Sequence, residues 1–217
     1  MAGLGLAAGE RQAMNLGELG WDGFFAAQLD KGLDKDGEII PARVRRQDVN
    51  QFHLLAETGE FIGQLPGRLR DAAESKASLP VVGDWVLVKP IAQGAANQVV
   101  IERLLTRKSS FSRKESGAAM AEQVLAANID TAFIVSGLDG DFNPNRIERY
   151  LLLSWDSGAQ PVIILNKTDL CPDANARAQE LAPTAMDTPI LLISALAGTG
   201  LEQLQGFMGP GKTSAFI

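Results

Sequence analysis

Two short motifs contain the residue types that a guanine-binding site needs, and each directly follows an apolar run. Asn166-Lys-Thr-Asp169 comes after Val162–Leu165, and Ser194-Ala-Leu196 comes after Ile190–Ile193. Both runs have the length and composition of buried strands. Ligands of open α/β sheets bind at the carboxyl ends of the strands, so we expect both motifs at one edge of a sheet. A simple helix-capping turn at the first motif would not explain the second.

The chemistry of these residues matches guanine better than adenine. The Asp169 carboxylate can accept from both N1–H and the 2-amino group of guanine, a donor pair that adenine lacks. The Asn166 amide can bond N7 and tie neighbouring loops together. The stem of Lys167 can lie along the purine face, and the backbone N–H of Ala195 can reach O6. The sequence therefore predicts a guanine site formed by Asn166, Lys167, Asp169, Ser194 and Ala195.

A third stretch, Gly206-Phe-Met-Gly-Pro-Gly-Lys-Thr213, fits the phosphate-loop pattern G-x-x-x-x-G-K-[ST]. A phosphate loop follows a buried strand and opens a helix, so that backbone amides surround the phosphate. Here the preceding Leu201–Phe207 has helical periodicity, and the following Thr213–Ile217 is apolar and β-prone. We therefore predict a helix-to-strand turn. The alternative is an ATP-type P-loop enzyme, in which Lys212→Ala would abolish nucleotide binding.

Residues 38–105 are predicted to form an all-β barrel of the OB-fold type. Short β-prone stretches with glycine between them occur at near-regular spacing, which is typical of a small closed barrel. The predicted strands are 42–46, 52–56, 61–65, 82–88 and 98–105. Residues 1–37 carry many Gly and Asp residues and are predicted to be a flexible, irregular lead.

The second half of the chain has a different pattern. Residues 106–128 are predicted to be a basic linker and a helix, with Phe111 packed against the following domain. Residues 129–217 alternate strands with helices, which predicts part of an α/β domain with a parallel sheet. Its strands are expected at 130–136, 162–165 and 190–193, and its helices at 144–157, 173–181 and 201–207. The first helix is capped by Asn143-Pro144, and its expected apolar face is Ile147, Leu151, Leu152 and Trp155.

The charge distribution suggests a polyanion-binding module. The whole chain has a net charge of −6, but residues 1–37 carry −3, residues 38–114 carry +4 and residues 115–217 carry −7. A basic segment inside an acidic chain favours an RNA-facing barrel, although any single basic residue can simply be a solvated surface charge. The candidate RNA-binding residues are Arg43, Arg45, Arg46, Arg68, Arg70, Arg107, Lys108, Arg113 and Lys114.

Several other kinds of site are excluded or unsupported. With one Cys and one His, the chain forms no internal disulfide and no His/Cys zinc site. The longest apolar runs are strand-sized, far short of the ~18 residues of a membrane span. We therefore expect a cytoplasmic, monomeric protein without a membrane partner. His53, Trp85 and Cys171 are expected to be structural. No catalytic residue and no metal ligand is predicted.

The motifs together resemble a known family. Asn166–Asp169, Ser194-Ala195 and Gly211–Ile217 are similar to the start of the permuted GTPase domain of the bacterial ribosome small-subunit-dependent GTPases (RsgA type). Further similar stretches lie upstream, and the resemblance covers about residues 40–217. These stretches are Val82-Gly-Asp-Trp85, Arg107–Arg113, Glu122–Asn128 and Phe142–Tyr150.

The resemblance implies a barrel that binds ribosomal RNA, a circularly permuted P-loop GTPase domain that uses GTP or GDP with Mg²⁺, and a zinc domain further on. It also implies late maturation of the small (30S) ribosomal subunit, with GTP hydrolysis coupled to release. Departures from the family are the phosphate loop, the switches and the zinc ligands, which this sequence lacks, and Leu196, where many GTPases have Lys. We therefore expect an amino-terminal portion that does not hydrolyse GTP by itself. The alternative is an RNA-binding OB-fold module with a non-hydrolysing nucleotide-like domain.

Overall fold

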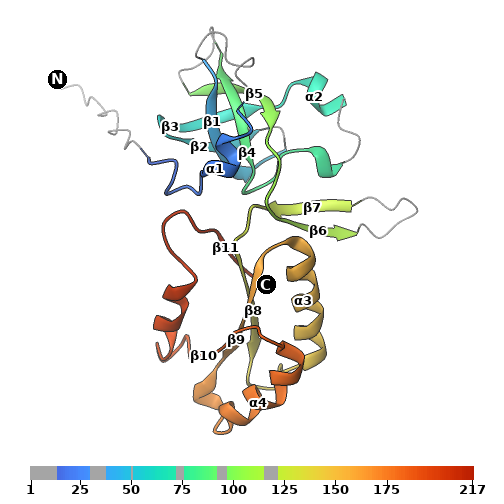
Figure 1. Ribbon diagram of the computed structural model, residues 1–217, viewed down its shortest axis with the longest axis vertical. Coiled ribbons are helices and arrows are strands. Elements are labelled where there is room, and N and C mark those ends of the chain that lie inside the picture. Colours follow the sequence, from blue (N-terminus) through green and yellow to red (C-terminus); the bar gives the residue numbers. More distant parts are fainter. Residues whose placement is uncertain (1–13, 30–37, 50, 72–75, 92–96, 115–121) are drawn as a thin grey trace, which may run out of the picture.

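Five strands close into a barrel in the first half of the chain (Figure 1). The computed structural model describes residues 14–29, 38–49, 51–71, 76–91, 97–114 and 122–217. The strand order is β1-β2-β3-β5-β4, in which β3 and β5 are parallel and the other pairs antiparallel. The strands are β1 (Ile40–Gln47), β2 (Phe52–Ala56), β3 (Gly59–Gln64), β4 (Trp85–Pro90) and β5 (Gln98–Leu104). The predicted five-stranded barrel is confirmed.

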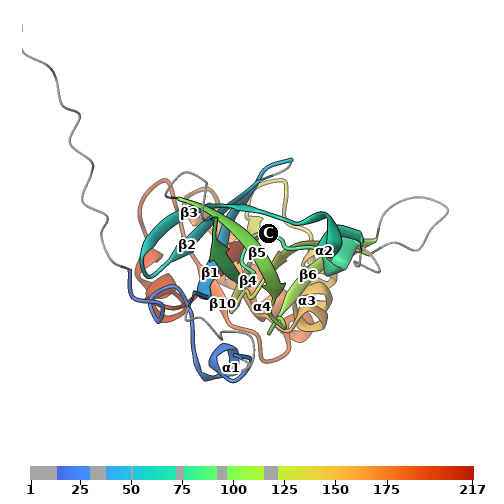
Figure 2. The same ribbon diagram turned by 90° about the horizontal axis from the view of Figure 1, so that it is seen from above.

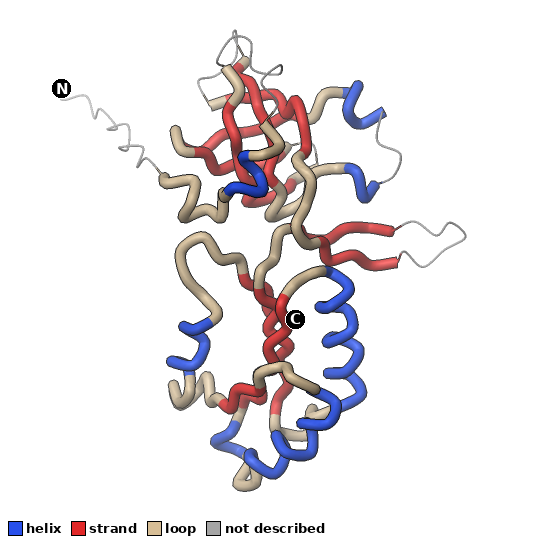
Figure 3. The backbone as a smooth tube through the Cα atoms, viewed as in Figure 1, coloured by secondary structure: helices blue, strands red, loops and turns tan. Residues whose placement is uncertain are grey.

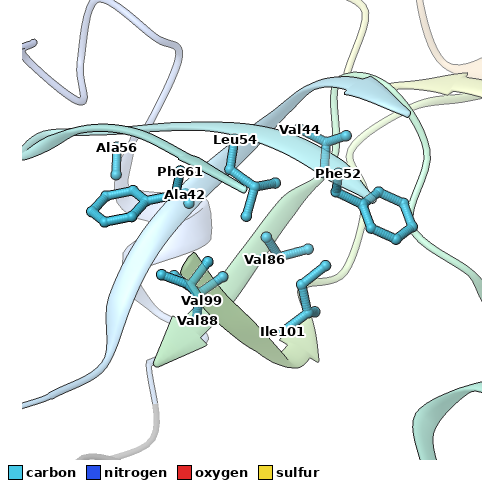
Figure 4. Close-up of a cluster of buried hydrophobic side chains, with 10 residues drawn as sticks. All are labelled: Ala42, Val44, Phe52, Leu54, Ala56, Phe61, Val86, Val88, Val99 and Ile101. Atoms are coloured by element: carbon cyan, nitrogen blue, oxygen red, sulfur yellow. The ribbon is translucent and has the colours of Figure 1, made fainter. Parts of the chain in front are cut away.

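Alternating apolar side chains fill the barrel (Figure 4). In β2 the buried positions are Phe52, Leu54 and Ala56, and the residues between them are less buried, as the two-residue period of a strand requires. A Cβ on Gly63 would lie 2.7 Å from Cδ1 of Leu54, so a glycine lets this interior close. Two short helical elements, α2 (Gly67–Asp71) and η1 (Lys76–Ser78), lie between β3 and β4.

The second half forms a four-stranded parallel sheet, as predicted. Its order is β10-β9-β8-β11, and all its pairs are parallel. The strands are β8 (Thr131–Gly137), β9 (Gln160–Asn166), β10 (Ile190–Leu192) and β11 (Ser214–Phe216). Helices α3 (Pro144–Ser157) and α4 (Ala174–Ala185) pack on one face, and the 3₁₀ helix η3 (Leu201–Gly206) packs on the other (Figure 3). The carboxyl ends of the four strands therefore point toward one edge, which β8 reaches at Gly137 beside Asn166, whereas β11 pairs only with Thr131–Phe133.

Helix α3 begins and ends as its sequence predicts, but its buried face is narrower. The Asn143 side chain accepts from the Arg146 amide, and Gly158 ends the helix in the left-handed conformation at φ 86°. Ile147 is buried against the sheet. Leu152 and Trp155, predicted on the apolar face, are 53% and 40% exposed.

The predicted helix in residues 106–128 is wrong. The described parts of this segment are two antiparallel strands, β6 (Ser110–Lys114) and β7 (Glu122–Ala127), which lie between the barrel and the parallel sheet (Figure 3). Phe111 is buried with Ile129 and Ala132, so its predicted packing against the second domain is confirmed. The hairpin is also hydrogen-bonded to the barrel half, since the N–H of Ala127, at the end of β7, donates to the carbonyl of Val82, just before β4, at 2.9 Å.

The prediction of a flexible lead is wrong for residues 14–29, which pack on the outside of the barrel (Figure 2). They contain the short helix α1 (Gly23–Ala26), whose Phe25 is buried with Trp85. Trp21 meets Trp85 edge to face, with ring centroids 4.8 Å apart. The remaining predicted lead, residues 1–13 and 30–37, lies outside the described residues. Within the described part, no helix is long and apolar enough to cross a membrane.

Candidate guanine-binding site

The two predicted motifs meet at the carboxyl edge of the sheet. Asn166 ends β9, and Ser194 follows β10. The buried Ser194 hydroxyl donates to Oδ1 of Asp169 at 2.5 Å and accepts from the Ala197 amide at 3.1 Å. This hydroxyl therefore fixes the Asp169 carboxylate, which is exposed to solvent, in the position from which it can accept from a base.

Asn166 ties the two loops together, as predicted. Its Oδ1 accepts from the Lys167 amide at 2.8 Å and from the Ala195 amide at 3.0 Å. A backbone bond from Thr168 N–H to the Ile193 carbonyl at 3.2 Å adds a second connection. The predicted bond from Ala195 to guanine O6 thus requires that its N–H be shared between O6 and Asn166.

Lys167 is held by an acidic partner that sequence reasoning missed. Its backbone is left-handed, at φ 66°, and its Nζ donates to Asp139, just after β8. The Asp139 bond raises the pKa of Lys167, and Lys167 holds the pKa of Asp139 below its usual value. A Cβ on Gly137 would lie 2.7 Å from Oδ1 of Asp139. The available signal was Gly-Leu-Asp directly after an apolar strand, at the same edge.

The 3₁₀ helix η2 (Thr168–Leu170) carries Asp169 away from β9, and α4 follows it. Leu196, beyond Ser194, is 91% exposed, so its side chain stands at the rim of the site. The residues brought together are therefore all five of the predicted set, with Asp139 added.

The geometry of residues 206–213 excludes a phosphate loop. These residues follow η3 and precede β11, so the predicted inverted context is confirmed. Three of the backbone amides that would surround a phosphate already donate to other groups of the protein. The Gly211 amide donates to the Glu18 carbonyl at 2.9 Å, the Lys212 amide to the Gly209 carbonyl at 3.0 Å, and the Thr213 amide to Asp130 at 2.8 Å. The ATP-type interpretation of this stretch is therefore wrong.

Two candidate RNA-binding residues, Arg43 and Arg107, are engaged inside the protein. Arg43 donates to the carbonyls of Leu19, Gly83 and Asn128, and its burial lowers its pKa. Arg107 donates to both carboxylate oxygens of the fully buried Asp84, at 2.8 and 2.7 Å. The sequence shows that a residue is cationic but not whether its side chain points to solvent or into the protein. Here the carbonyls that bond Arg43 and the buried carboxylate that bonds Arg107 draw both side chains inward.

The other basic candidates differ in their surroundings. Arg45 pairs with Glu60 at 2.9 Å, Arg46 with Asp48 at 2.8 Å, and Arg68 with Glu102. Lys108 pairs with Asp22, and its Nζ lies 5.0 Å from the centre of the Phe25 ring. Arg70 is exposed on α2. Arg113 and Lys114 lie on β6, and their side chains are outside the described residues.

The described residues at this edge present exposed donors and acceptors without a cluster of metal ligands. Among them, no group of three or more His, Cys, Asp and Glu side chains could hold an ion. The Asp169 carboxylate, the Asn166 amide and the Ser194 loop are donors and acceptors of the kinds that the predicted guanine site needs.

Comparisons with known proteins point in the same direction. The family model described as RsgA GTPase matches residues 86–217. The small ribosomal subunit biogenesis GTPase RsgA of Opitutus terrae is 41% identical over 210 residues, which are 94% of this chain and 57% of that protein. Its counterpart in Syntrophotalea carbinolica is 39% identical, over 94% of this chain and 56% of that protein. The chain thus spans about half the length of these curated relatives.

Two solved structures share the fold. The crystal structure of YjeQ from Thermotoga maritima matches with a TM-score of 0.65 and 25% identity, over 82% of this chain and 60% of that one. YloQ, described as a circularly permuted GTPase, matches with a TM-score of 0.61 and 18% identity, over 84% of this chain and 61% of that one. The barrel followed by a permuted α/β domain is therefore a fold that solved proteins share.

Proposed function

The chain belongs to the RsgA GTPase family, and we propose that it forms the barrel and the guanine-reading part of a cytoplasmic, monomeric GTPase that acts in late biogenesis of the small ribosomal subunit. In this proposal the barrel binds ribosomal RNA and the sheet edge binds guanine nucleotide. GTP hydrolysis, coupled to release from the subunit, requires elements that this sequence does not contain.

The proposed nucleotide binding is supported by one observation: the loops after β9 and β10 are hydrogen-bonded to each other at the carboxyl edge of the sheet. The Ser194–Asp169 and Ala195–Asn166 bonds connect them and leave the Asp169 carboxylate exposed. Such pre-ordering lowers the cost of binding, because the acceptor is already oriented. Two charge-assisted bonds to guanine contribute about 1.5–3 kcal/mol each, which suffices for base discrimination.

GTP and GDP with Mg²⁺ are the proposed ligands of the longer family protein. Strand β11 points toward the edge that carries Asn166 and Ser194, because it runs parallel to β8. A phosphate loop that follows such a strand would bring phosphates next to the base site. A zinc domain belongs to the same proposal and involves no residue of this chain.

Base recognition by Asp169 can be tested by exchanging a hydrogen-bond acceptor of the protein for a donor, and by making the opposite exchange on the base. Xanthine has a carbonyl where guanine has its 2-amino group, so Asp169→Asn should reverse the preference between them. We expect native chain to bind guanosine at least about tenfold tighter than xanthosine, and the variant to prefer xanthosine, since one charge-assisted bond is worth more than 1.4 kcal/mol. Chemical-shift titration of this chain measures both affinities.

The matched control is Asp173→Asn, four residues along, whose exposed side chain makes no capping bond. It should keep the native preference. A retained guanine preference in Asp169→Asn would remove Asp169 from the site and with it the main support for this function.

The proposed RNA face uses the exposed basic residues of the barrel and hairpin, without Arg43 and Arg107. Ion pairs such as Arg46–Asp48 are solvent-exposed and therefore weak, so a phosphate can replace the carboxylate at little cost. Replacing Arg46 by Gln should reduce the slope of log K against log salt by about 0.7 for a single-stranded contact. Filter binding to small-subunit rRNA at several salt concentrations measures this slope.

A second candidate function is an RNA-binding module whose α/β part never hydrolyses nucleotide. The observation behind it is that the described residues contain no phosphate loop, since the amides of the Gly211 to Thr213 turn are bonded within the protein. This alternative predicts that guanine nucleotide leaves RNA affinity unchanged. The proposed GTPase predicts that RNA affinity differs between the GTP-bound and GDP-bound forms of the longer family protein.

A further inference from the structure

Residues 14–29, which we call the strap, contribute nothing to the base site, yet they touch both halves of the molecule. The strap, the barrel and the segment before β11 surround a cavity of about 140 Å³. Its lining includes Gly17, Gly20, Arg43, Asn128, Asp130 and Gly211. Residues 206–213, which fit the phosphate-loop pattern, therefore lie next to the strap, a contact that the pattern does not predict.

The strap is fixed firmly to the barrel. Phe25 is 1% exposed and packs with Trp85, which is itself 1% exposed. The Met14 amide donates to the Glu57 carbonyl at 3.2 Å, in the turn between β2 and β3. The Thr106 amide donates to Oε1 of Gln28 at 2.6 Å. Movement of the barrel must therefore carry the strap with it.

The strap meets the segment before β11 backbone to backbone. The Gly211 amide donates to the Glu18 carbonyl at 2.9 Å. A Cβ on Gly211 would lie 2.6 Å from the Gly17 carbonyl oxygen, and its φ of +75° also favours glycine. A Cβ on Gly20 would lie 3.0 Å from the Gly211 carbonyl oxygen. The two backbone segments can come this close only because glycines, which have no side chain, lie at the contact.

Arg43 joins the strap, the barrel and the residue after the hairpin through one guanidinium group. Its donors reach Leu19 in the strap, Gly83 before β4 and Asn128 after the hairpin. Its Cζ lies 5.7 Å from the centre of the Trp85 ring. Because five N–H donors in a fixed plane serve several carbonyls, a shift of any one part disturbs the others.

The segment that receives this contact continues into β11 within a few residues. The Thr213 amide donates to Asp130 at 2.8 Å, and the Asp130 amide donates to the Thr213 carbonyl at 2.8 Å. Strand β11 then runs beside the first residues of β8, and the Ile217 amide donates to the Phe133 carbonyl at 2.9 Å. A hydrogen-bonded path therefore leads from the strap through β11 to β8, and β8 continues to Gly137, which pairs with Asn166 at the edge that carries the base site.

We propose that the strap, Gly211 and Arg43 are positioning elements that transmit occupancy of the barrel to β11, and so to the nucleotide edge of the sheet. The proposal rests on the RNA role of the barrel. In it, residues 206–213 serve as the docking loop of the strap. RNA that binds the barrel restricts the strap, the strap restricts Gly211, and β11 becomes less free to open.

Amide hydrogen exchange of this chain, with and without protein-free small-subunit rRNA, tests the transmission. We expect RNA to slow exchange in the barrel and also in residues 213–217, the latter by about fivefold or more, the lower end of ordinary coupling between sites. Gly211→Ala blocks the contact with Gly17 and should abolish the effect on residues 213–217 while the barrel stays protected. Gly209→Ala is the matched control, because a Cβ there meets nothing within 4 Å.

A second variant keeps the proposal testable if Gly211→Ala fails to fold. Arg43→Lys keeps the charge but loses the planar set of donors, and it should weaken transmission in the same direction. Barrel protection without any change in residues 213–217 of native chain would overturn the inference and leave the RNA role intact. No protection anywhere would overturn the RNA role, and the inference with it. Equal transmission in Gly211→Ala and Gly209→Ala would also refute the docking loop.

Discussion

Replacing Arg107 by leucine tests whether a buried ion pair holds the end of the barrel. Asp84 is fully buried at 0% exposure, and the side chain of Arg107 is 15% exposed. Besides its two bonds to Asp84, Arg107 donates to the carbonyls of Ala77 at 2.7 Å and Leu79 at 2.9 Å. The substitution leaves the carboxylate buried without a hydrogen-bonded cation; the Val81 amide still donates to it at 2.8 Å, and Arg43 is the remaining cation that acts on it through charge alone.

The expected cost is large at neutral pH. Removing one partner of a buried pair costs about 3–5 kcal/mol, against a total stability of roughly 5–15 kcal/mol for a typical protein. Burial already raises the pKa of Asp84, opposed chiefly by the bonds from Arg107, so the variant raises that pKa further. A carboxyl with a higher pKa folded than unfolded adds stability below its unfolded pKa, and this is lost as pH rises through the folded pKa. The deficit of the variant should therefore grow as pH rises.

Urea unfolding followed by circular dichroism, at about pH 5 and about pH 7, measures the deficit at each pH. The double variant Asp84→Asn/Arg107→Leu removes the buried charge and should recover part of the loss at pH 7. A deficit below about 1 kcal/mol at pH 7 would mean that the pair behaves like an exposed one. A deficit independent of pH, or no recovery in the double variant, would refute the role assigned to the Asp84 charge.

Four further substitutions test the packing. Gly83→Ala should lower the midpoint of thermal unfolding, because its φ is +90° and its Cβ would lie 2.1 Å from the Ala127 carbonyl oxygen; an unchanged midpoint would contradict the tight junction. Phe25→Ala should cost about 3–5 kcal/mol in urea unfolding, whereas a loose lead would lose almost nothing. Ile147→Ala should cost about 2–5 kcal/mol and Leu152→Ala only about 0.5 kcal/mol, and equal costs would refute the narrow buried face of α3.

Local sequence was sufficient where the structure depends on local order. A strand buries alternate or consecutive apolar residues, and the residue after its last one must lie at the sheet edge. Asn166 and Ser194 could therefore be placed together from their positions alone. The same reasoning rejected Gly206–Thr213 as a phosphate loop, because a helical turn precedes it and a strand comes after it. Capping by Asn143 was equally local.

Tertiary structure decided the features that depend on partners distant in sequence. Arg43 and Arg107 have the same chemistry as exposed arginines, and only carbonyls and a carboxylate contributed by other segments turn them inward. The strap could not be recognised locally, since its few apolar residues become a core only against Trp85. The sequence by itself determined the barrel, the parallel sheet and the position of the two predicted motifs after its strands, through periodicity and strand ends. The tertiary structure alone decided which charges are buried and how the two halves touch, because burial and close backbone contact are properties of pairs of segments.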